Sequence, residues 1–340
     1  MDCMFRFQPY TLELRHRFSI AGSSRSTTPV MLVEIEKDGI TGYGEASMPP
    51  YLGESHASAR TFLSAIDFGR YDNLSLLEDI LRDIDGLAPG NNAAKAAVDI
   101  ALHDWAGKKA GVAWHAIWNL DGRHTLPTSF TIGMEADRDA LRRKVEEADP
   151  YRILKVKLGD ERDRQTVSTI REMTDKPIRV DVNQGWGDRE HALETIEWLA
   201  ARNVGLVEQP MAKEKIDDHA WLTERSPLPI IADESIQRLG DIRKVRGAYH
   251  GINIKLMKSA GMREARSMAL LAREWGMKVM IGCMTETSCA ISAASQLLPL
   301  ADYADLDGAL LITNDPFRGA TVVDGMVQIP EGPGIGVTKM

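Results

Sequence analysis

The sequence has little of what would mark a secreted or nucleic-acid-binding protein. Among its 340 residues are only three cysteines, Cys3, Cys283 and Cys289, an odd number without CxxC spacing. That count argues against a disulfide framework or a zinc knuckle and favours a reducing compartment. No run rich in lysine and arginine is present, and the formal net charge is −8. We therefore expect no nucleic-acid partner and favour a small-molecule partner.

Long apolar runs are also missing. The first residues, MDCMFRFQPY, lack the apolar core of a signal peptide, and no uninterrupted apolar stretch reaches membrane-spanning length. We therefore expect a cytoplasmic protein without membrane contact. Hydrophobic residues make up 44% of the chain and charged residues 26%, which is typical of a globular protein. The length suits roughly two domains, or one α/β barrel with an accessory domain.

The first 120 residues combine strand patterns with helix patterns. The segment PVMLVEIEKDGITGYGEAS contains two strand-like runs joined at Asp38-Gly39, a pair typical of two-residue hairpin turns. Strands followed by helices predict an α+β capping domain over residues 1–120. Three helical stretches follow the hairpin, with apolar residues at three- and four-residue spacing: ESHASARTFLSAI, LSLLEDILRDI and the Ala-rich NNAAKAAVDIALHDWAGKKAG.

From about residue 127 short apolar runs alternate with amphipathic helical stretches. Their spacing of roughly 25 residues suits βα units, so the sequence predicts an α/β fold with a (β/α)7–8 barrel of the TIM type over residues 121–317. The last run has the weakest pattern, which leaves seven strands open beside eight. We expect the tail, residues 318–340, to return to the first domain. The runs are SFTIGM, ILKVKLG, PIRVDVNQ, VGLVEQP, LPIIADES, GINIKL, MKVMIGCM and YADLDG.

Acidic residues stand at the carboxyl ends of three consecutive runs, where a barrel of this kind builds its active site. They are Asp181, Glu208 and Asp233. Three negative charges at one point repel one another strongly unless a cation neutralises them. Oxygen ligands favour a hard ion, and Mg²⁺ usually keeps positions open for water or substrate. Together the acids predict a Mg²⁺ site, although each one alone is more often a solvated loop residue or a helix cap.

Two lysines also occupy strand ends. Lys157 follows Lys155 by two residues, so both side chains point to the same face of the strand. The charge of Lys155 disfavours the protonated amine of Lys157, which is how a lysine becomes a usable base near neutral pH. Lys255 ends a strand further round the barrel and is expected to face Lys157 across the mouth. For either lysine alone, the alternative is a snorkelling side chain or a simple ion pair.

These groups together suit one kind of chemistry. A metal beside two opposed lysines favours removal of a proton α to a carboxylate, because the cation stabilises the negative charge that develops on the oxygens. Two further acids, Asp305 and Asp307, stand two residues apart on the expected face of the last strand. Paired carboxylates there can hold a cation. The alternative is that Asp305 caps a turn before Gly308.

The sequence resembles the muconate lactonizing enzyme subgroup of the enolase superfamily over essentially its full length. Within that subgroup it is most similar to the dipeptide epimerases, the group that contains L-Ala-D/L-Glu epimerase. The segments that carry the resemblance are KVK at 155–157, DVNQGW at 181–186, VEQP at 207–210, ADES at 232–235, NIKLMKSAG at 253–261, GCMTETS at 282–288 and DLDG at 305–308.

The resemblance implies roles for the residues at the strand ends. One Mg²⁺ ion per subunit would be bound by three acids, and two lysines would act as acid/base catalysts on opposite faces of the substrate α-carbon: Asp181, Glu208 and Asp233 for the metal, Lys157 and Lys255 for the proton. It also implies that Lys155 tunes Lys157 and touches the substrate carboxylate. Lys157 would serve the (R) substrate and Lys255 the (S) substrate. Homo-oligomers are common in the superfamily, so a homo-oligomer is expected.

The resemblance also implies how a dipeptide is recognised. In dipeptide epimerases the two acids of the DxD pattern bind the free α-ammonium, a role that falls here to Asp305 and Asp307. Thr131 and Cys283 match positions that line the pocket in that family. Cys283 fits equally well as a small core residue.

Side-chain specificity is expected from two loops of the first domain, SIAGSSRST and MPPYLGES, which would cover the barrel mouth and exclude water. Arg25 fits an acidic substrate side chain such as Glu, because a guanidinium matches a carboxylate well. In the alternative interpretation, residues of the second loop shape an apolar pocket for hydrophobic dipeptides: Met48, Pro49, Pro50 and Tyr51. The sequence alone leaves both interpretations open.

The sequence therefore predicts a Mg²⁺-dependent dipeptide epimerase that inverts the α-carbon of the C-terminal residue by 1,1-proton transfer. The favoured substrate is the cell-wall dipeptide L-Ala-D-Glu, which would place the protein in murein peptide recycling. Three enzymes of the subgroup share the metal and the lysines and stay as alternatives: o-succinylbenzoate synthase, N-acylamino acid racemase and muconate cycloisomerase. The alternative from another class is a non-catalytic binding protein that has kept the fold.

Overall fold

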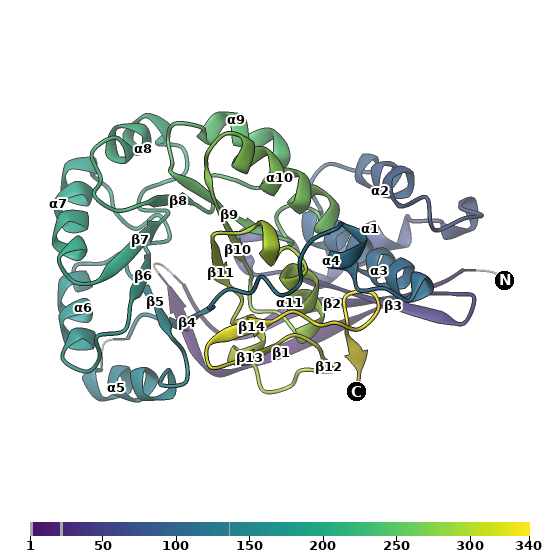
Figure 1. Ribbon diagram of the computed structural model, residues 1–340, viewed down its shortest axis with the longest axis horizontal. Coiled ribbons are helices and arrows are strands. Elements are labelled where there is room, and N and C mark those ends of the chain that lie inside the picture. Colours follow the sequence, from purple (N-terminus) through teal and green to yellow (C-terminus); the bar gives the residue numbers. More distant parts are fainter. Residues whose placement is uncertain (1–2, 21–22, 136) are drawn as a thin grey trace.

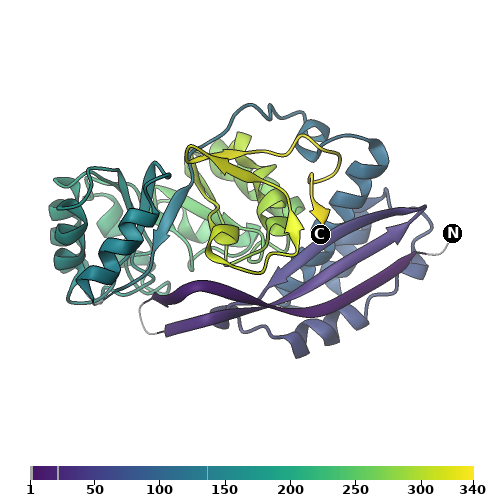
Figure 2. The same ribbon diagram turned by 90° about the horizontal axis from the view of Figure 1, so that it is seen from below.

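The computed structural model describes residues 3–20, 23–135 and 137–340. An antiparallel sheet with packed helices forms one part, and a ring of parallel strands with helices outside it forms the other (Figure 1). In the view from below, the long strands of the first part, in purple, extend beneath the ring (Figure 2). The capping part therefore reaches the barrel with its own sheet.

The chain opens with three antiparallel strands: β1 (Met4–Ile20), β2 (Ser23–Lys37) and β3 (Ile40–Ser47). Asp38 and Gly39 form the turn between β2 and β3 with φ angles of 55° and 75°, which confirms the predicted hairpin. Strand β1 was not predicted. It lies at the edge of the sheet, and among its described side chains only Leu12 is fully buried, so its sequence carries a weak apolar signal.

The three predicted helices are confirmed, and they pack against this sheet. Helix α3 approaches β3 so closely that only glycine fits at two positions of that strand. A Cβ atom on Gly42 would lie 2.1 Å from the carbonyl oxygen of Ala101, and one on Gly44 would lie 1.9 Å from that of Ala97. The helices of this part are α1 (His56–Ser64), α2 (Leu77–Gly86), α3 (Asn92–Ala110) and α4 (Trp114–Ile117), with 3-10 turns η1 (Pro50–Leu52) and η2 (Phe68–Arg70).

Eight parallel strands follow, which confirms the prediction with eight strands rather than seven. They hydrogen-bond in sequence order, and a bridge between Thr128 and Ala304 brings the last strand beside the first. The ring is therefore nearly closed, and the carboxyl ends of its strands share one rim. The strands are β4 (Ser129–Ile132), β5 (Ile153–Lys157), β6 (Ile178–Asp181), β7 (Val204–Glu208), β8 (Ile230–Ala232), β9 (Gly251–Lys255), β10 (Lys278–Gly282) and β11 (Tyr303–Asp305).

Helices connect the strands and cover the outside of the ring (Figure 1). Their buried faces carry apolar residues at three- and four-residue spacing, as an amphipathic helix requires. They are α5 (Arg138–Glu147), α6 (Asp163–Arg171), α7 (Arg189–Ala200), α8 (Ile216–Thr223), α9 (Ile242–Val245), α10 (Met262–Glu274) and α11 (Ser288–Ser295), with 3-10 turns η3 (Leu239–Asp241), η4 (Leu298–Leu300) and η5 (Gly308–Leu311).

The C-terminal tail contacts both parts of the molecule. Lys339 pairs with Glu34 of β2 at 2.6 Å, whereas the amide of Thr128, just before β4, donates to the carbonyl of Gly325 at 3.0 Å. The division into domains at residues 120 and 317 stays a prediction. The tail strands are β12 (Phe317–Arg318), β13 (Thr321–Val323), β14 (Met326–Gln328) and β15 (Thr338–Lys339), paired as β12 with β15 and β13 with β14.

Among the described residues, none of the helices combines the length and the apolar character needed to cross a membrane.

Candidate active site

Three neighbouring strands bring three carboxylates together at the rim of the barrel. Asp181 is the last residue of β6, Glu208 is the last of β7, and Asp233 directly follows β8. One carboxylate oxygen from each acid lies within 4.8 Å of those from the other two, and all three residues are buried. Burial, and after it the charge of Asp181, raise the pKa of Glu208 to about 7. An all-oxygen set of this kind fits a hard divalent cation.

Lys155 supplies positive charge at the centre of the acid cluster. Its Nζ lies 3.0 Å from Asp181, 2.7 Å from Glu208 and 2.6 Å from Asp305. Burial disfavours the ammonium form, but the surrounding carboxylates outweigh that effect and hold the pKa of Lys155 well above its ordinary value. Lys155 therefore stays charged and neutralises the interior of the barrel.

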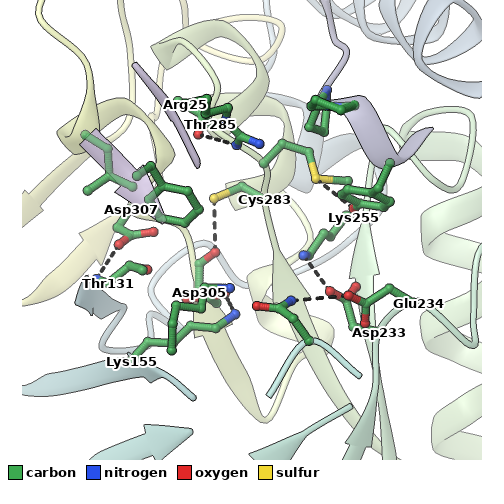
Figure 3. Close-up of a pocket in the computed structure, with 18 of the residues that line it drawn as sticks. Arg25, Thr131, Lys155, Asp233, Glu234, Lys255, Cys283, Thr285, Asp305 and Asp307 are labelled. Atoms are coloured by element: carbon green, nitrogen blue, oxygen red, sulfur yellow. Dashed lines mark hydrogen bonds and ion pairs between the residues drawn. The ribbon is translucent and has the colours of Figure 1, made fainter. Parts of the chain in front are cut away.

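Lys157 and Lys255 stand at opposite edges of the cluster. Nζ of Lys157 lies 2.6 Å from Asp181, and Nζ of Lys255 lies 2.8 Å from Asp233. Strands β6, β7 and β8 separate their two strands on one side of the ring, and β10, β11 and β4 separate them on the other. The two amines therefore approach the cavity from opposite sides. Figure 3 shows Lys255 beside Asp233, across the cavity from Lys155.

Two residues that the sequence analysis missed hold the acids in place. Lys258 is fully buried and binds Asp233 twice, through the carboxylate at 2.5 Å and the main-chain carbonyl at 2.6 Å. Asn253 donates its side-chain amide to Glu208 at 2.8 Å. A sequence signal existed, because Asn253 and Lys258 are polar residues flanking Lys255 in an otherwise apolar buried segment.

Glu234 was also missed, and it lines the same cavity beside Asp233. Its side chain accepts a hydrogen bond from Asn183 at 3.2 Å, and its second carboxylate oxygen is buried with no hydrogen-bond partner among residues 3–20, 23–135 and 137–340. Burial and the charge of Asp233 raise the pKa of Glu234 to about 7. A neutral carboxyl group here is consistent with the excess of negative charge around it.

Asp305 and Asp307 both line the cavity, but they do not share a strand face as expected. Strand β11 ends at Asp305, and Asp307 begins the turn η5. Asp305 accepts hydrogen bonds from Ser129 and Lys155, each at 2.6 Å, whereas Asp307 accepts from the amide of Thr131 at 2.6 Å. Burial and the charge of Asp305 raise the pKa of Asp307 to about 6. Asp307 therefore has fewer cationic partners than Asp305, which pairs with Lys155.

Arg25 lies on strand β2 and not on a loop, because β1 and β2 extend further over the barrel than the sequence indicated. The residues at 21–22, at the tip of the predicted SIAGSSRST loop, lie outside the described residues. Arg25 donates to Thr285 at 3.2 Å and stacks over Phe18, and among the described residues no acid pairs with it. Figure 3 shows it on the wall opposite Lys155.

The cavity has a volume of about 430 Å³, enough for a small molecule. Thr131 and Cys283 line it as the resemblance implied, and the thiol of Cys283 donates to the carbonyl of Asp305 at 3.2 Å. Pro49, Pro50 and Tyr51 line the outer wall, whereas Met48 is buried in the core away from the cavity. Three of the four residues expected to shape an apolar pocket therefore line the cavity, beside charged residues.

The capping part also holds the loop between β10 and α11. Glu45 of β3 is fully buried and accepts hydrogen bonds from the amides of Thr287 and Ala290 at the start of α11. Ser47 donates to the carbonyl of Thr285 at 2.7 Å. Because Thr285 also contacts Arg25, the first sheet fixes one wall of the cavity.

Comparison with known proteins identifies the relatives of this chain. Residues 6–120 match the family described as mandelate racemase / muconate lactonizing enzyme, N-terminal domain, and residues 136–339 match the enolase C-terminal domain-like family. The chain is 56% identical over 335 residues to an L-Ala-D/L-Glu epimerase of Bacteroides thetaiotaomicron, covering 98% of this chain and 87% of that relative.

Solved structures give the same picture. A substrate-liganded L-Ala-D/L-Glu epimerase from Bacillus subtilis superposes with a TM-score of 0.91 at 27% identity, over 99% of this chain and 98% of that one. A dipeptide epimerase from Enterococcus faecalis, complexed with Mg and L-Leu-L-Tyr, superposes with a TM-score of 0.90 at 29% identity, over 98% of each chain. The chain belongs to the mandelate racemase and muconate lactonizing enzyme family of the enolase superfamily, with dipeptide epimerases among its relatives.

Proposed function

We propose that the protein is a Mg²⁺-dependent dipeptide epimerase that inverts the α-carbon of the C-terminal residue, with L-Ala-D-Glu and L-Ala-L-Glu as substrates. The observation that carries the proposal is the placement of Lys157 and Lys255 on opposite sides of one cavity, at the two edges of the acid cluster. Two amines on opposite faces of a carbon atom are what inversion by proton transfer requires.

The acids Asp181, Glu208 and Asp233 would hold the Mg²⁺ ion, since their oxygens converge and are buried. When bound, the ion stabilises the negative charge that develops on the substrate carboxylate as the α-proton leaves. Lys155 lies among the same acids and adds a fixed positive charge near that carboxylate. The protein thereby lowers the free energy of a charge that water alone stabilises poorly.

The proton moves between the two lysines through the substrate. One lysine, as the free amine, takes the α-proton; the C–H bond breaks and its electron pair moves toward the carboxylate oxygens. The other lysine, as the ammonium ion, donates a proton to the opposite face, so that a new C–H bond forms with inverted configuration. We assign the (R) substrate to Lys157 and the (S) substrate to Lys255.

Asp307 and Asp305 select dipeptides over substrates without an ammonium group. Asp307 lies at the barrel mouth with one main-chain donor, so its remaining oxygen positions suit the α-ammonium of an L-Ala residue. The related o-succinylbenzoate and N-acylamino acid substrates carry no such cation. This difference separates the proposed function from those alternatives.

Arg25 favours Glu at the epimerised position. Its guanidinium lines the cavity and contacts only Thr285 and the ring of Phe18 among the described residues. A half-buried guanidinium without an acidic partner among the described residues suits a substrate carboxylate, which would form a charge-assisted hydrogen bond with it. Since L-Ala-D-Glu occurs in cell-wall peptides, we assign the enzyme to cytoplasmic murein peptide recycling.

Replacing Lys255 by Ala should abolish epimerisation while solvent deuterium exchange continues for one configuration only. Lys157 remains able to remove and return the α-proton of L-Ala-D-Glu on its own face, and Lys258 still pairs with Asp233. Mass spectrometry of each dipeptide in D₂O measures the exchange. Lys278→Ala, which removes an exposed lysine paired with Asp302, is the control. Exchange that is lost for both configurations, or retained for both, contradicts the assignment.

Replacing Arg25 by Gln should lower kcat/KM for L-Ala-D-Glu by roughly tenfold to a hundredfold, the usual cost of a lost charged hydrogen bond. Epimerisation of L-Ala-L-Leu should change little, because that side chain has no carboxylate. Arg17→Gln serves as the matched control, since Arg17 is exposed and its side chain donates to Ser24. Equal losses for both dipeptides would assign Arg25 a structural role instead.

Replacing Lys258 by Met should weaken Mg²⁺ binding by roughly tenfold or more, as measured by isothermal titration calorimetry without substrate. Lys258 binds both the carboxylate and the carbonyl of Asp233, so its loss frees that ligand to turn away. Lys244→Met, which removes an exposed lysine, is the control. An unchanged dissociation constant for Mg²⁺ in a folded Lys258→Met protein would show that Lys258 does not position Asp233.

A further inference from the structure

A second cavity lies where helices of the capping part meet helix α10 of the barrel. Its volume is about 340 Å³, and it shares no lining residue with the cavity at the barrel mouth. Helix α3 of the capping part packs against α2, α4 and helix α10 of the barrel (Figure 1). The residues that line the cavity come from these helices, the residues before α2 and the residue after α4, so it lies where the two parts meet. The side chains that decide its chemistry are His103, Trp114, Trp118 and Arg266.

His103 is a buried histidine, and one of its two ring nitrogens already makes a hydrogen bond. Its Nδ1 donates to the main-chain oxygen of Asp99 at 2.7 Å and lies 3.1 Å from the carboxylate of the same residue. Asp99 in turn accepts the amide of Met262 at 2.6 Å, at the start of α10. Burial disfavours the charged imidazole, but Asp99 outweighs that effect and raises the pKa of His103. Because Nδ1 already donates, Nε2 can donate toward the cavity only from the protonated imidazolium, the form that Asp99 favours.

Arg266 carries a positive charge that no described acid neutralises. Its guanidinium lies 5.6 Å from the centre of the Trp118 ring, and its buried Nε has no hydrogen-bond partner among the residues that the structure describes. The neighbouring Arg263 differs, because it lies 3.6 Å from Glu78. Buried hydrogen-bond donors in folded proteins normally have an acceptor. The Nε of Arg266 therefore lacks an acceptor that a bound ligand could supply.

The aromatic wall adds a second unsatisfied donor and an apolar surface. Trp114 is 5% exposed, and its buried indole Nε1 has no hydrogen-bond partner in the described part of the chain. The rings of His103, Trp114 and Trp118 pack edge to face, with centroids 4.5 to 5.9 Å apart. Leu76, which is 56% exposed, extends the apolar surface at the rim. The wall thus combines donors for an anion with a surface for an apolar group.

The acids of the wall limit the charge of a ligand. The side chains of Glu78 and Asp79 are 70% and 68% exposed, and they pair with Arg263 and Arg82 at the surface. The guanidinium of Arg266 and the imidazole of His103 suit a ligand with a single negative charge. A dianion such as a phosphate would need further cations to offset its repulsion by Glu78 and Asp79.

We propose that this cavity binds a small monocarboxylate that carries an aromatic or branched apolar group. The carboxylate accepts hydrogen bonds from Arg266 and from Nε2 of His103, and the apolar group packs against Trp118, Trp114 and Leu76. Because the walls belong to both parts of the molecule, the bound ligand stabilises their junction. This site is separate from the proposed epimerase site and does not depend on that function.

The test uses the full-length Mg²⁺-loaded protein, labelled with ¹⁵N at its tryptophan indoles, and phenylacetate as the probe. Saturable shifts are expected in the signals of Trp114 and Trp118, with a dissociation constant of ~1 mM. The signal of Trp186, near the barrel mouth and hydrogen-bonded to Asp163, should not move at the same concentrations. Phenylacetamide, which has the same shape without the charge, should bind at least about tenfold more weakly.

Variants identify the groups that recognise the anion. Arg266→Gln should weaken phenylacetate binding by roughly tenfold or more. Arg246→Gln is the matched control, because that guanidinium stacks on Trp275 outside the cavity. His103→Gln should weaken binding as well; if it fails to fold, Arg266→Gln alone decides, since Arg266 is partly exposed.

Three results would overturn the proposal. They are the absence of saturable shifts at Trp114 and Trp118 up to about 20 mM phenylacetate, equal binding of phenylacetamide, and unchanged binding by Arg266→Gln. Shifts at Trp186 alone would place the probe at the barrel mouth and would equally count against a second site.

Discussion

The structure depends on three buried carboxylates whose oxygens lie within 4.8 Å of one another. Such a cluster is costly, because each acid loses water and meets like charges. The chain offsets the cost with buried amines, Lys155 at the centre of the cluster and Lys258 beneath Asp233. A divalent cation completes the neutralisation. The negative charge that makes the cluster costly is what would hold the cation, and the cation would stabilise the negative charge that develops on a substrate.

The barrel and the capping part contribute different residues to the proposed active site. The strand ends of the barrel supply the metal ligands and the lysines, which fits a reaction common to many substrates. The long β1–β2 hairpin supplies Arg25 and Phe18, and β3 holds the loop after β10 through Glu45 (Figure 2). Substitutions in the capping sheet can therefore change the side chain that is accepted without disturbing the proton transfer.

Much of this arrangement was predictable from the sequence, because a strand followed by a helix repeats and the strand ends carry charged residues. The eight strands and the Asp38-Gly39 hairpin followed from local pattern. Strand β1 did not, since its partners lie on β2 and little of it is buried. The placement of Arg25 was missed for the same reason. Lys258 was missed because its role depends on its partner Asp233, which lies 25 residues away just after another strand, although its position in an apolar segment was a signal.

The central claim is that an α-proton passes between two lysines while a Mg²⁺ ion stabilises the charge left behind. The most direct measurement follows L-Ala-D-Glu with the Mg²⁺-loaded enzyme in D₂O, by proton NMR and mass spectrometry. The account predicts L-Ala-L-Glu that is one mass unit heavier and lacks its Glu α-proton signal, with both changes stopped by EDTA. Epimerised product without deuterium, or unchanged turnover in EDTA, would contradict it.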